Sequence, residues 1–262
     1  MVAKVDQVRF YRVKALAPRP YTPRTDRLAL DVGLSPLLAT DRGDLLGRGF
    51  LRMLLAYDAE IQAIARKAQR EGKRLREVEA YREAVGRLRE FLRNEVNRLL
   101  NRLLALHAPA ALVVERLDLR SPELSRRMNR LVSNFGRRYL KEKLQRLQEL
   151  YGIQVVEANP AYTSQECARC GYVDPRNRQD TQTFRCLACG HRGNAQVNAA
   201  KNLLRRSSPG SGIQPFTPKR QVLQILLAEY LERHQGGWSA ARERAWATNP
   251  YTKALARSKP PG

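Results

Sequence analysis

Short runs of adjacent apolar residues occur early and in the middle of the chain, and they predict β-strands. The runs at 28–33 and 111–117 have the length of buried strands, and 153–157 has that of a third. Residues 36–40 lead into a turn and a short strand, so we expect the sheet to begin with antiparallel strands. Residues 7–13 are a further candidate strand before a proline-rich, extended segment. Together these runs indicate an α/β protein with a mixed sheet.

Helical spacing of apolar residues fills the long interval between the first and later strands. From about 47 to 107, apolar residues recur every three to four positions, and a break at 71–73 divides the interval into two helices. We expect an antiparallel hairpin with a charged, solvent-exposed face. A third helix is predicted over 121–150, because its first residues, Ser-Pro-Glu, are typical of a helix N-terminus. Two shorter helices are expected near 193–206 and 219–235.

The charge of the chain indicates a polyanionic partner. Its 262 residues include 48 Lys and Arg against 25 Asp and Glu, a formal net charge of +23. Such an excess repels itself unless it meets a polyanion, and nucleic acid is the first candidate, although a basic protein of the ribosomal kind would show the same balance. No apolar run is long enough to cross a membrane, so no membrane partner is expected. The first residues do not resemble a secretory signal peptide, and we expect a cytoplasmic location.

The four cysteines of the chain form two C-x-x-C pairs separated by fifteen residues. This spacing is typical of a four-cysteine zinc site. A glycine follows each pair and suits the tight turn of a zinc knuckle. Four thiolates leave no open position for a substrate, so the Zn²⁺ is predicted to be structural; two disulfides are the alternative, which a chain of this size does not need. The predicted ligands are Cys167, Cys170, Cys186 and Cys189.

Two acidic residues interrupt the apolar runs. Asp31 is followed closely by Gly33, an arrangement that builds metal sites but also occurs in turns. Glu115 lies within the run 111–117, where a buried carboxylate is costly unless something compensates it. A divalent cation shared with Asp31 would do so, and an ion pair with Arg116 or another basic residue is the alternative.

The predicted helix over 121–150 is dense in basic residues, while its apolar residues keep one face for a core. A basic stripe of this kind follows a phosphate backbone and provides affinity without sequence choice. The predicted nucleic-acid contacts are Arg126, Arg127, Arg130, Arg137, Arg138 and Lys141.

A more specific pattern runs from Tyr162 to Asn202. It reads Y-T-S-x-x-C-x-x-C-G, then F-x-C-x-x-C-G, then N-A-x-V-N-A-A-x-N. This pattern resembles the C-terminal half of TnpB (also called OrfB), the transposon-encoded RNA-guided nuclease family from which type V CRISPR effectors descend. The resemblance implies a ribonuclease H-like (RuvC) fold with a mixed sheet, a helical hairpin insertion and an inserted four-cysteine zinc ribbon.

By the same resemblance, Asp31 and Glu115 correspond to the first two carboxylates of a RuvC nuclease, which hold Mg²⁺ or Mn²⁺. The third position is an aspartate in the family and is Gln196 in this chain. An amide lacks the charge of a carboxylate, so we expect weaker metal binding and cleavage that is reduced or lost. No acid is an obvious substitute for it: Glu157 ends the strand before the ribbon, and Asp174 and Asp180 lie within the zinc segment.

Only 30 residues precede Asp31, whereas TnpB relatives carry longer N-terminal domains that grip guide RNA and read the target-adjacent motif. We therefore expect either a separate protein subunit that supplies those functions or a degenerate remnant.

The sequence is predicted to divide into five parts. They are an N-terminal lead-in at 1–27, a RuvC-like core at 28–158 with its helical insertion at about 47–107, a zinc ribbon at 159–192, the last RuvC helix at 193–206, and a linker, amphipathic helix and basic tail at 207–262. The resemblance does not cover the last part.

These features predict a nucleic-acid-binding, RuvC-like protein. We expect RNA-guided DNA binding within a complex of guide RNA and target DNA, with metal-dependent cleavage weak or lost. An active, divalent-metal-dependent DNA endonuclease of the TnpB type is the first alternative, and a structural subunit that scaffolds RNA or a partner protein is the second. Metal-dependent cleavage separates the first two.

Overall fold

The computed structural model describes residues 20–115 and 121–252, so the candidate strand at 7–13 lies outside the described residues. Five strands form the central sheet: β1 (Thr25–Val32), β2 (Leu38–Thr40), β3 (Leu45–Leu46), β4 (Pro109–Glu115) and β5 (Gln154–Ala158). Their order is β3-β2-β1-β4-β5. β2 is antiparallel to both neighbours, whereas β4 is parallel to β1 and β5. The expected α/β class with a mixed sheet is confirmed.

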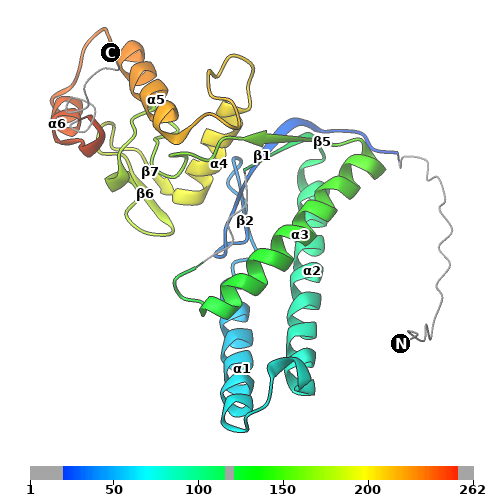
Figure 1. Cartoon of the computed structure of the whole chain (residues 1–262). Coiled ribbons are helices and arrows are strands. Elements are labelled where there is room, and N and C mark those ends of the chain that lie inside the picture. The colour runs from blue at the N-terminus through cyan, green and yellow to red at the C-terminus, as the bar shows by residue number, and fades with distance from the viewer. Residues whose placement is uncertain (1–19, 116–120, 253–262) are drawn as a thin grey trace.

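Six α-helices occur in the described residues: α1 (Phe50–Arg70), α2 (Glu79–His107), α3 (Arg126–Tyr151), α4 (Ala195–Arg206), α5 (Lys219–Arg233) and α6 (Ala240–Thr248). α1 and α2 form an antiparallel pair that extends away from the sheet, and α3 lies across this pair (Figure 1). Within the described residues, no helix is both long and apolar enough to cross a membrane.

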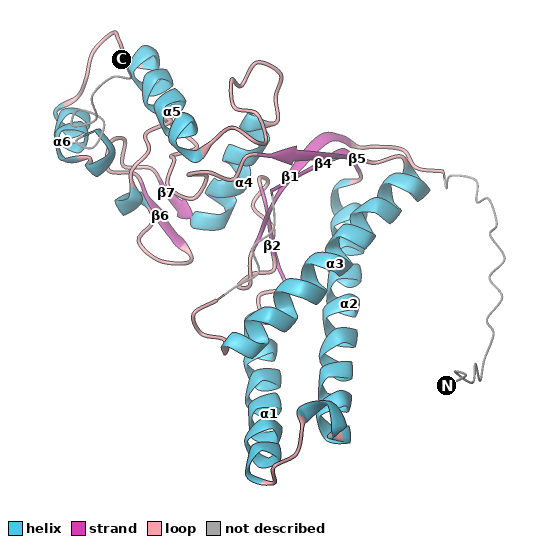
Figure 2. Ribbon diagram, viewed as in Figure 1, coloured by secondary structure: helices cyan, strands magenta, loops and turns pink. Residues whose placement is uncertain are grey.

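Different helices cover the two faces of the sheet (Figure 2). Leu28 and Leu30 of β1 pack in the main core with apolar residues of α1, α2 and α3. Successive residues of a strand point to opposite faces, so Ala29 and Val113 face the other side, where they pack with Leu203 of α4. The sheet is therefore buried between α1–α3 and α4, which explains the nearly continuous apolar runs of β1 and β4.

Helix α3 begins at Arg126, and the prediction that it begins at Ser121 is wrong. Its N-cap is Ser125, whose Oγ accepts a hydrogen bond from the N–H of Met128 at 3.1 Å. The same hydroxyl donates to the buried carboxylate of Asp58 in α1 at 2.6 Å. The hydrogen bond to Asp58 explains why Ser125, and not Ser121, is the N-cap of α3, because it holds Ser125 in the non-helical backbone conformation of an N-cap.

The zinc-ribbon segment and the last two helices form the other end of the molecule (Figure 1). The segment contains the short strands β6 (Thr183–Arg185) and β7 (Arg192–Asn194), which pair antiparallel. Beyond α5, the sequence predicts only a basic tail, but residues 240–248 form α6. The ring of Trp246 in α6 stacks on Tyr230 of α5 at 5.8 Å, so this helix forms through a contact between distant residues.

Candidate functional site

Asp31 and Glu115 come together at one edge of the sheet. β1 and β4 are parallel and pair Leu30 with Val114, so the two acids follow this pair directly. Both side chains are half-buried. Glu115 is the last described residue of β4, and the last two residues of the predicted run 111–117 lie outside the described residues. The acids meet because the carboxyl ends of parallel strands share an edge.

The environment of this edge opposes negative charge. Burial raises the pKa of Asp31 to about 7, although the guanidinium of Arg178 acts against the rise. Burial and the charge of Asp31 together raise the pKa of Glu115 to about 8, while Arg206 and Arg178 oppose the rise. Among the described residues neither acid forms an ion pair, and Arg116, the alternative partner of Glu115, lies outside them. Two adjacent carboxyls shielded from water are the kind of group that a hard divalent cation stabilises in the charged form.

Gln196 lies against the loop that follows Asp31. Its backbone N–H is held by Asn194, the N-cap of α4, and its side chain is 6% exposed. Its Nε2 donates to the carbonyl oxygen of Ser35 at 2.9 Å. Within the described residues its Oε1 is buried and has no hydrogen-bond partner. Two carboxyls and one unpaired amide oxygen fit a hard divalent ion, with one negative charge fewer than three carboxylates would supply.

None of the three alternative acids joins this pair. Glu157 is exposed on β5. Asp174 is fully buried and accepts from Arg176 Nη2 at 2.7 Å. Asp180 accepts the backbone N–H groups of Gln182 and Thr183, both at 2.7 Å. In the described part of the chain, the four cysteines are the one group of three or more His, Cys, Asp or Glu side chains close enough to hold a metal ion.

The four cysteines form a tight cluster, with all four sulfur atoms within 4.8 Å of one another. The Sγ atoms of Cys170 and Cys186 are 3.6 Å apart, and those of Cys167 and Cys189 are 3.8 Å apart. Tetrahedral zinc with Zn–S bonds of about 2.3 Å places its sulfurs about 3.8 Å apart, so the cluster fits this metal. Gly171 and Gly190 each adopt positive φ, 82° and 71°, and so allow the knuckle turns.

Two asparagines of α4 attach this cluster to the sheet. Asn198 Nδ2 donates to the carbonyl oxygen of Glu166 at 2.8 Å, and Asn202 Nδ2 donates to the same oxygen at 2.7 Å. The buried Glu166 carboxylate also forms an ion pair with Arg206 at 2.8 Å. The repeated Asn and Ala of the sequence pattern are therefore explained by close packing of α4 on the residues that precede Cys167. The same helix places Gln196 against the loop after Asp31.

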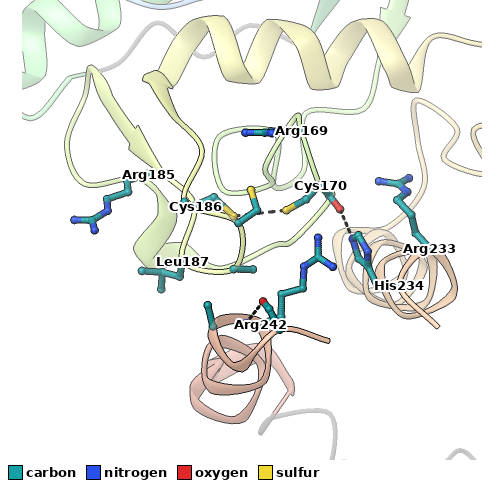
Figure 3. A pocket seen from close by; sticks show the side chains of 13 residues that line it. Arg169, Cys170, Arg185, Cys186, Leu187, Arg233, His234 and Arg242 are labelled. Carbon is teal, nitrogen blue, oxygen red and sulfur yellow. Dashed lines mark hydrogen bonds between the residues drawn. The ribbon is translucent and has the colours of Figure 1, made fainter. Parts of the chain in front are cut away.

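A basic hollow of about 770 Å³ lies between the two knuckles and helices α5 and α6 (Figure 3). Its lining includes no acidic residue. Arg242 of α6 extends toward Cys170 and His234, and His234 Nε2 lies 3.2 Å from the carbonyl oxygen of Cys170. Sequence reasoning did not find this hollow, because α6 was not predicted. Its basic lining residues are Arg169, Arg185, Arg233, His234 and Arg242.

Part of the predicted basic surface of α3 forms a second hollow, of about 740 Å³. Arg126, Arg130 and Arg137 line it together with Ser133, whose buried hydroxyl has no partner among the described residues. The remaining predicted contacts lie apart. Arg127 is over the ring of Tyr81 at 5.9 Å, Arg138 pairs with Glu142 at 3.1 Å, and Lys141 is exposed to solvent.

Comparison with known proteins finds a similarity that covers the second half of α3, the ribbon segment and most of α4. Residues 138–203 match the family model described as Cas12f1-like, TNB domain. The chain is 40% identical over 75 residues to the CRISPR-associated endodeoxyribonuclease Cas12f1 of Sulfoacidibacillus thermotolerans, covering 29% of this chain and 18% of that protein. It is 39% identical over 77 residues to InsQ of Escherichia coli K12, provisionally assigned as an RNA-guided DNA endonuclease, covering 29% of this chain and 19% of InsQ.

A shorter relative is matched over most of its length. This chain is 34% identical over 89 residues to a protein of Methanocaldococcus jannaschii provisionally assigned as a transposase. The match covers 31% of this chain and 74% of that protein. By contrast, the chain spans less than a fifth of Cas12f1 and of InsQ.

Proposed function

Because the chain belongs to the TnpB family, we propose that it is a nucleic-acid-binding protein with a RuvC-type, ribonuclease H-like core. It acts in a complex with a guide RNA and a target DNA, and its metal-dependent cleavage is weak or lost. The observation that carries this proposal is the meeting of Asp31 and Glu115 at one sheet edge, with Gln196 at the position of the family's third aspartate.

The chemistry of the proposed site follows from its oxygen atoms. Asp31 and Glu115 would hold Mg²⁺ or Mn²⁺, which would supply activation of water and stabilisation of the leaving oxygen in phosphodiester cleavage. Asp31 and Glu115 must lose their protons to bind a cation, and their raised pKa values oppose this near neutral pH. Gln196 offers only its neutral Oε1. The site therefore holds a cation less tightly than one with a third carboxylate.

The basic surfaces support a nucleic-acid partner. The hollow on α3 and the hollow between the knuckles and α6 together contain seven arginines, and neither lining includes an acidic side chain. Guanidinium groups without carboxylate neighbours bind phosphate oxygens. InsQ is provisionally assigned as an RNA-guided DNA endonuclease, and Cas12f1 is an endodeoxyribonuclease. These relatives favour RNA as the guide and DNA as the target.

The remaining parts of the proposal concern the ribbon and the partner chain. Cys167, Cys170, Cys186 and Cys189 hold a structural Zn²⁺, which fixes the knuckles against α4. The complex also includes a separate protein subunit that contributes to binding of the guide RNA. The proposed divisions remain the RuvC-like core at 28–158, the ribbon at 159–192, the last RuvC helix at 193–206 and the C-terminal region at 207–262.

Cleavage of single- and double-stranded DNA, with Mg²⁺ or Mn²⁺ and with co-purifying RNA retained, tests this proposal. The native chain is expected to bind DNA without cutting it, and Gln196→Asp is expected to cut. The Gln196→Asp, Asp31→Ala double variant is the control, because it restores the third carboxylate and removes the first. Binding of neither RNA nor DNA would refute the proposal.

An active endonuclease is the second candidate function. The unpaired Oε1 of Gln196 favours it, because an amide oxygen is an acceptable ligand for a hard cation. Cleavage by the native chain that Asp31→Ala abolishes would establish this candidate and reject the loss of activity.

A further inference from the structure

Phe216 is the most exposed large apolar residue in the described part of the chain. Its side chain is 85% exposed, whereas the next in order, Leu106, is 47% exposed. It lies in the loop between α4 and α5, which the sequence predicts to be a flexible or extended linker. Exposure of a whole aromatic ring is unfavourable in water, so its conformation requires a structural cause.

The turn that carries Phe216 is held from inside the molecule. Asn159, which is 4% exposed, donates from Nδ2 to the carbonyl oxygens of Gln214 and Thr217 at 3.0 and 2.9 Å. The turn also closes on itself, because the backbone N–H of Thr217 donates to the oxygen of Gln214 at 3.0 Å and the Thr217 hydroxyl accepts from the N–H of Gln214 at 2.9 Å. Ile213 is buried just before it. The ring is therefore displayed by a fixed turn within the segment that connects α4 and α5.

The fixed turn lies at the sheet edge that carries the candidate catalytic acids. Asn159 directly follows β5, and the last residue of β5, Ala158, pairs with Glu115 of β4. Adjacent strands are about 4.8 Å apart. Asn159, which anchors the Phe216 turn, therefore follows the residue that pairs with Glu115 on the neighbouring strand. The loop that contains Phe216 lies beside the end of β5 (Figure 1).

The charge around the turn selects a class of ligand. The 22 residues from Ser207 to Ala228 include no acidic residue. Lys219 and Arg220 are exposed at the start of α5, immediately after the turn. A protein partner would bury a continuous apolar patch, whereas a single ring flanked by cations matches an unpaired nucleobase flanked by phosphates.

We propose that Phe216 is a stacking platform for an unpaired base of the nucleic-acid strand that approaches Asp31 and Glu115. This inference rests on the proposed function, since it assumes that a nucleic acid is bound. The ring of Phe216 covers one face of the base, and Lys219 and Arg220 neutralise the adjacent phosphates. Stacking on a fixed ring has a small entropic cost and accepts every base, so it positions the strand without reading its sequence.

Binding of a labelled oligothymidine, with and without abasic positions, tests the platform. Phe216→Ala is expected to weaken binding of the intact strand by about 5- to 150-fold, the range that base stacking supplies. Phe216→Tyr is expected to bind as the native chain does. On the fully abasic strand, native protein and Phe216→Ala are expected to bind equally. Leu106→Ala is the matched control, because Leu106 is exposed at the opposite edge of the sheet, just before β4.

The outcomes separate this inference from the proposed function. Equal binding of the intact strand by native protein and Phe216→Ala would overturn the inference while nucleic-acid binding stands. An equal loss on intact and abasic strands would also overturn it, because the ring would then contact the backbone or support the turn. If the native chain binds no oligonucleotide, both the stacking inference and the proposed nucleic-acid-binding function are refuted. Unchanged melting temperatures of the Phe216 variants establish that the fold is intact.

Discussion

Gln196 Nε2 donates a hydrogen bond to the carbonyl oxygen of Ser35, at 2.9 Å. The contact joins the first turn of α4 to the loop after Asp31, and the Gln196 side chain is packed so closely that a Cβ on Gly33 would lie 3.3 Å from the same nitrogen. An aspartate has no N–H to donate and is one methylene shorter. The glutamine therefore stabilises this edge of the sheet in a way that an aspartate does not.

Gln196→Asp is expected to destabilise the metal-free protein by about 1–3 kcal/mol, because the Ser35 oxygen loses its donor and faces a carboxylate. Urea unfolding in EDTA measures this loss. Added Mg²⁺ is expected to restore the stability of the variant more than that of the native chain, since a third carboxylate strengthens cation binding. Gln196→Asn, which keeps a neutral amide, is the control for side-chain length. Equal stability of Gln196→Asp and native protein in EDTA would show that the Ser35 contact contributes nothing.

Replacing Cys167 and Cys186 by serine is expected to release zinc and to lower the melting temperature. The reason is that α4 binds the residue directly before Cys167, so loss of the proposed metal loosens this contact. Zinc content and thermal melting are measured on the same preparation. Leu187→Ser is the matched control, since Leu187 lies in the second knuckle, is partly exposed and is not a ligand. Native zinc content in the double cysteine variant would refute the metal site.

The stability of the metal-free protein is expected to fall as pH rises. Burial raises the pKa of Asp31 to about 7, and burial with the charge of Asp31 raises that of Glu115 to about 8. Both folded values exceed the values of about 4 in the unfolded chain. The folded state therefore binds more protons, and this contribution is complete below about pH 4 and is lost as pH rises through 7 to 8.

Urea unfolding in EDTA across this pH range checks the prediction, with the Asp31→Asn, Glu115→Gln variant as the reference. The difference in unfolding free energy between native protein and reference is expected to decrease toward high pH. Stabilisation by Mg²⁺ is expected to increase over the same range, because the cation binds the deprotonated acids. A difference that is independent of pH would contradict the raised pKa values.

Reversing Arg126, Arg130 and Arg137 to glutamate is expected to flatten the salt dependence of nucleic-acid binding. Each lost phosphate contact lowers the slope of log K against log salt by about 0.9. The matched control reverses Arg70, Arg74 and Arg76, which are exposed where the α1–α2 pair ends, far from the sheet (Figure 1). A slope that changes equally in both triple variants would show that net charge, and not the hollow on α3, determines the binding.

Several parts of the fold follow from short stretches of sequence. The spacing of the cysteines and the glycine after each pair are local features, and their sulfurs form one cluster. The apolar runs around Leu28 and Leu112 predict buried strands, and the structure has β1 and β4 there. The inference that Gln196 stands where the family has an aspartate also came from the sequence pattern alone. The roles of Asp31, Glu115 and Gln196 in metal binding remain predictions.

Other features depend on contacts that no local pattern encodes. Asp58 determines which serine caps α3, and Tyr230 supplies the surface on which Trp246 and α6 pack. Asn159 makes a segment rich in Ser, Gly and Pro into a fixed turn with Phe216 at its surface. In each case one side chain acts on a segment more than ten residues away.

The sequence by itself determined the grouping of the four cysteines, the principal strands and helices and the family, because residue spacing and apolar periodicity act over a few positions. The tertiary structure decided which ends of these elements meet. Only the folded sheet brings Asp31 beside Glu115 and places the Phe216 turn one strand away, because parallel strands carry residues that are far apart in sequence to a common edge.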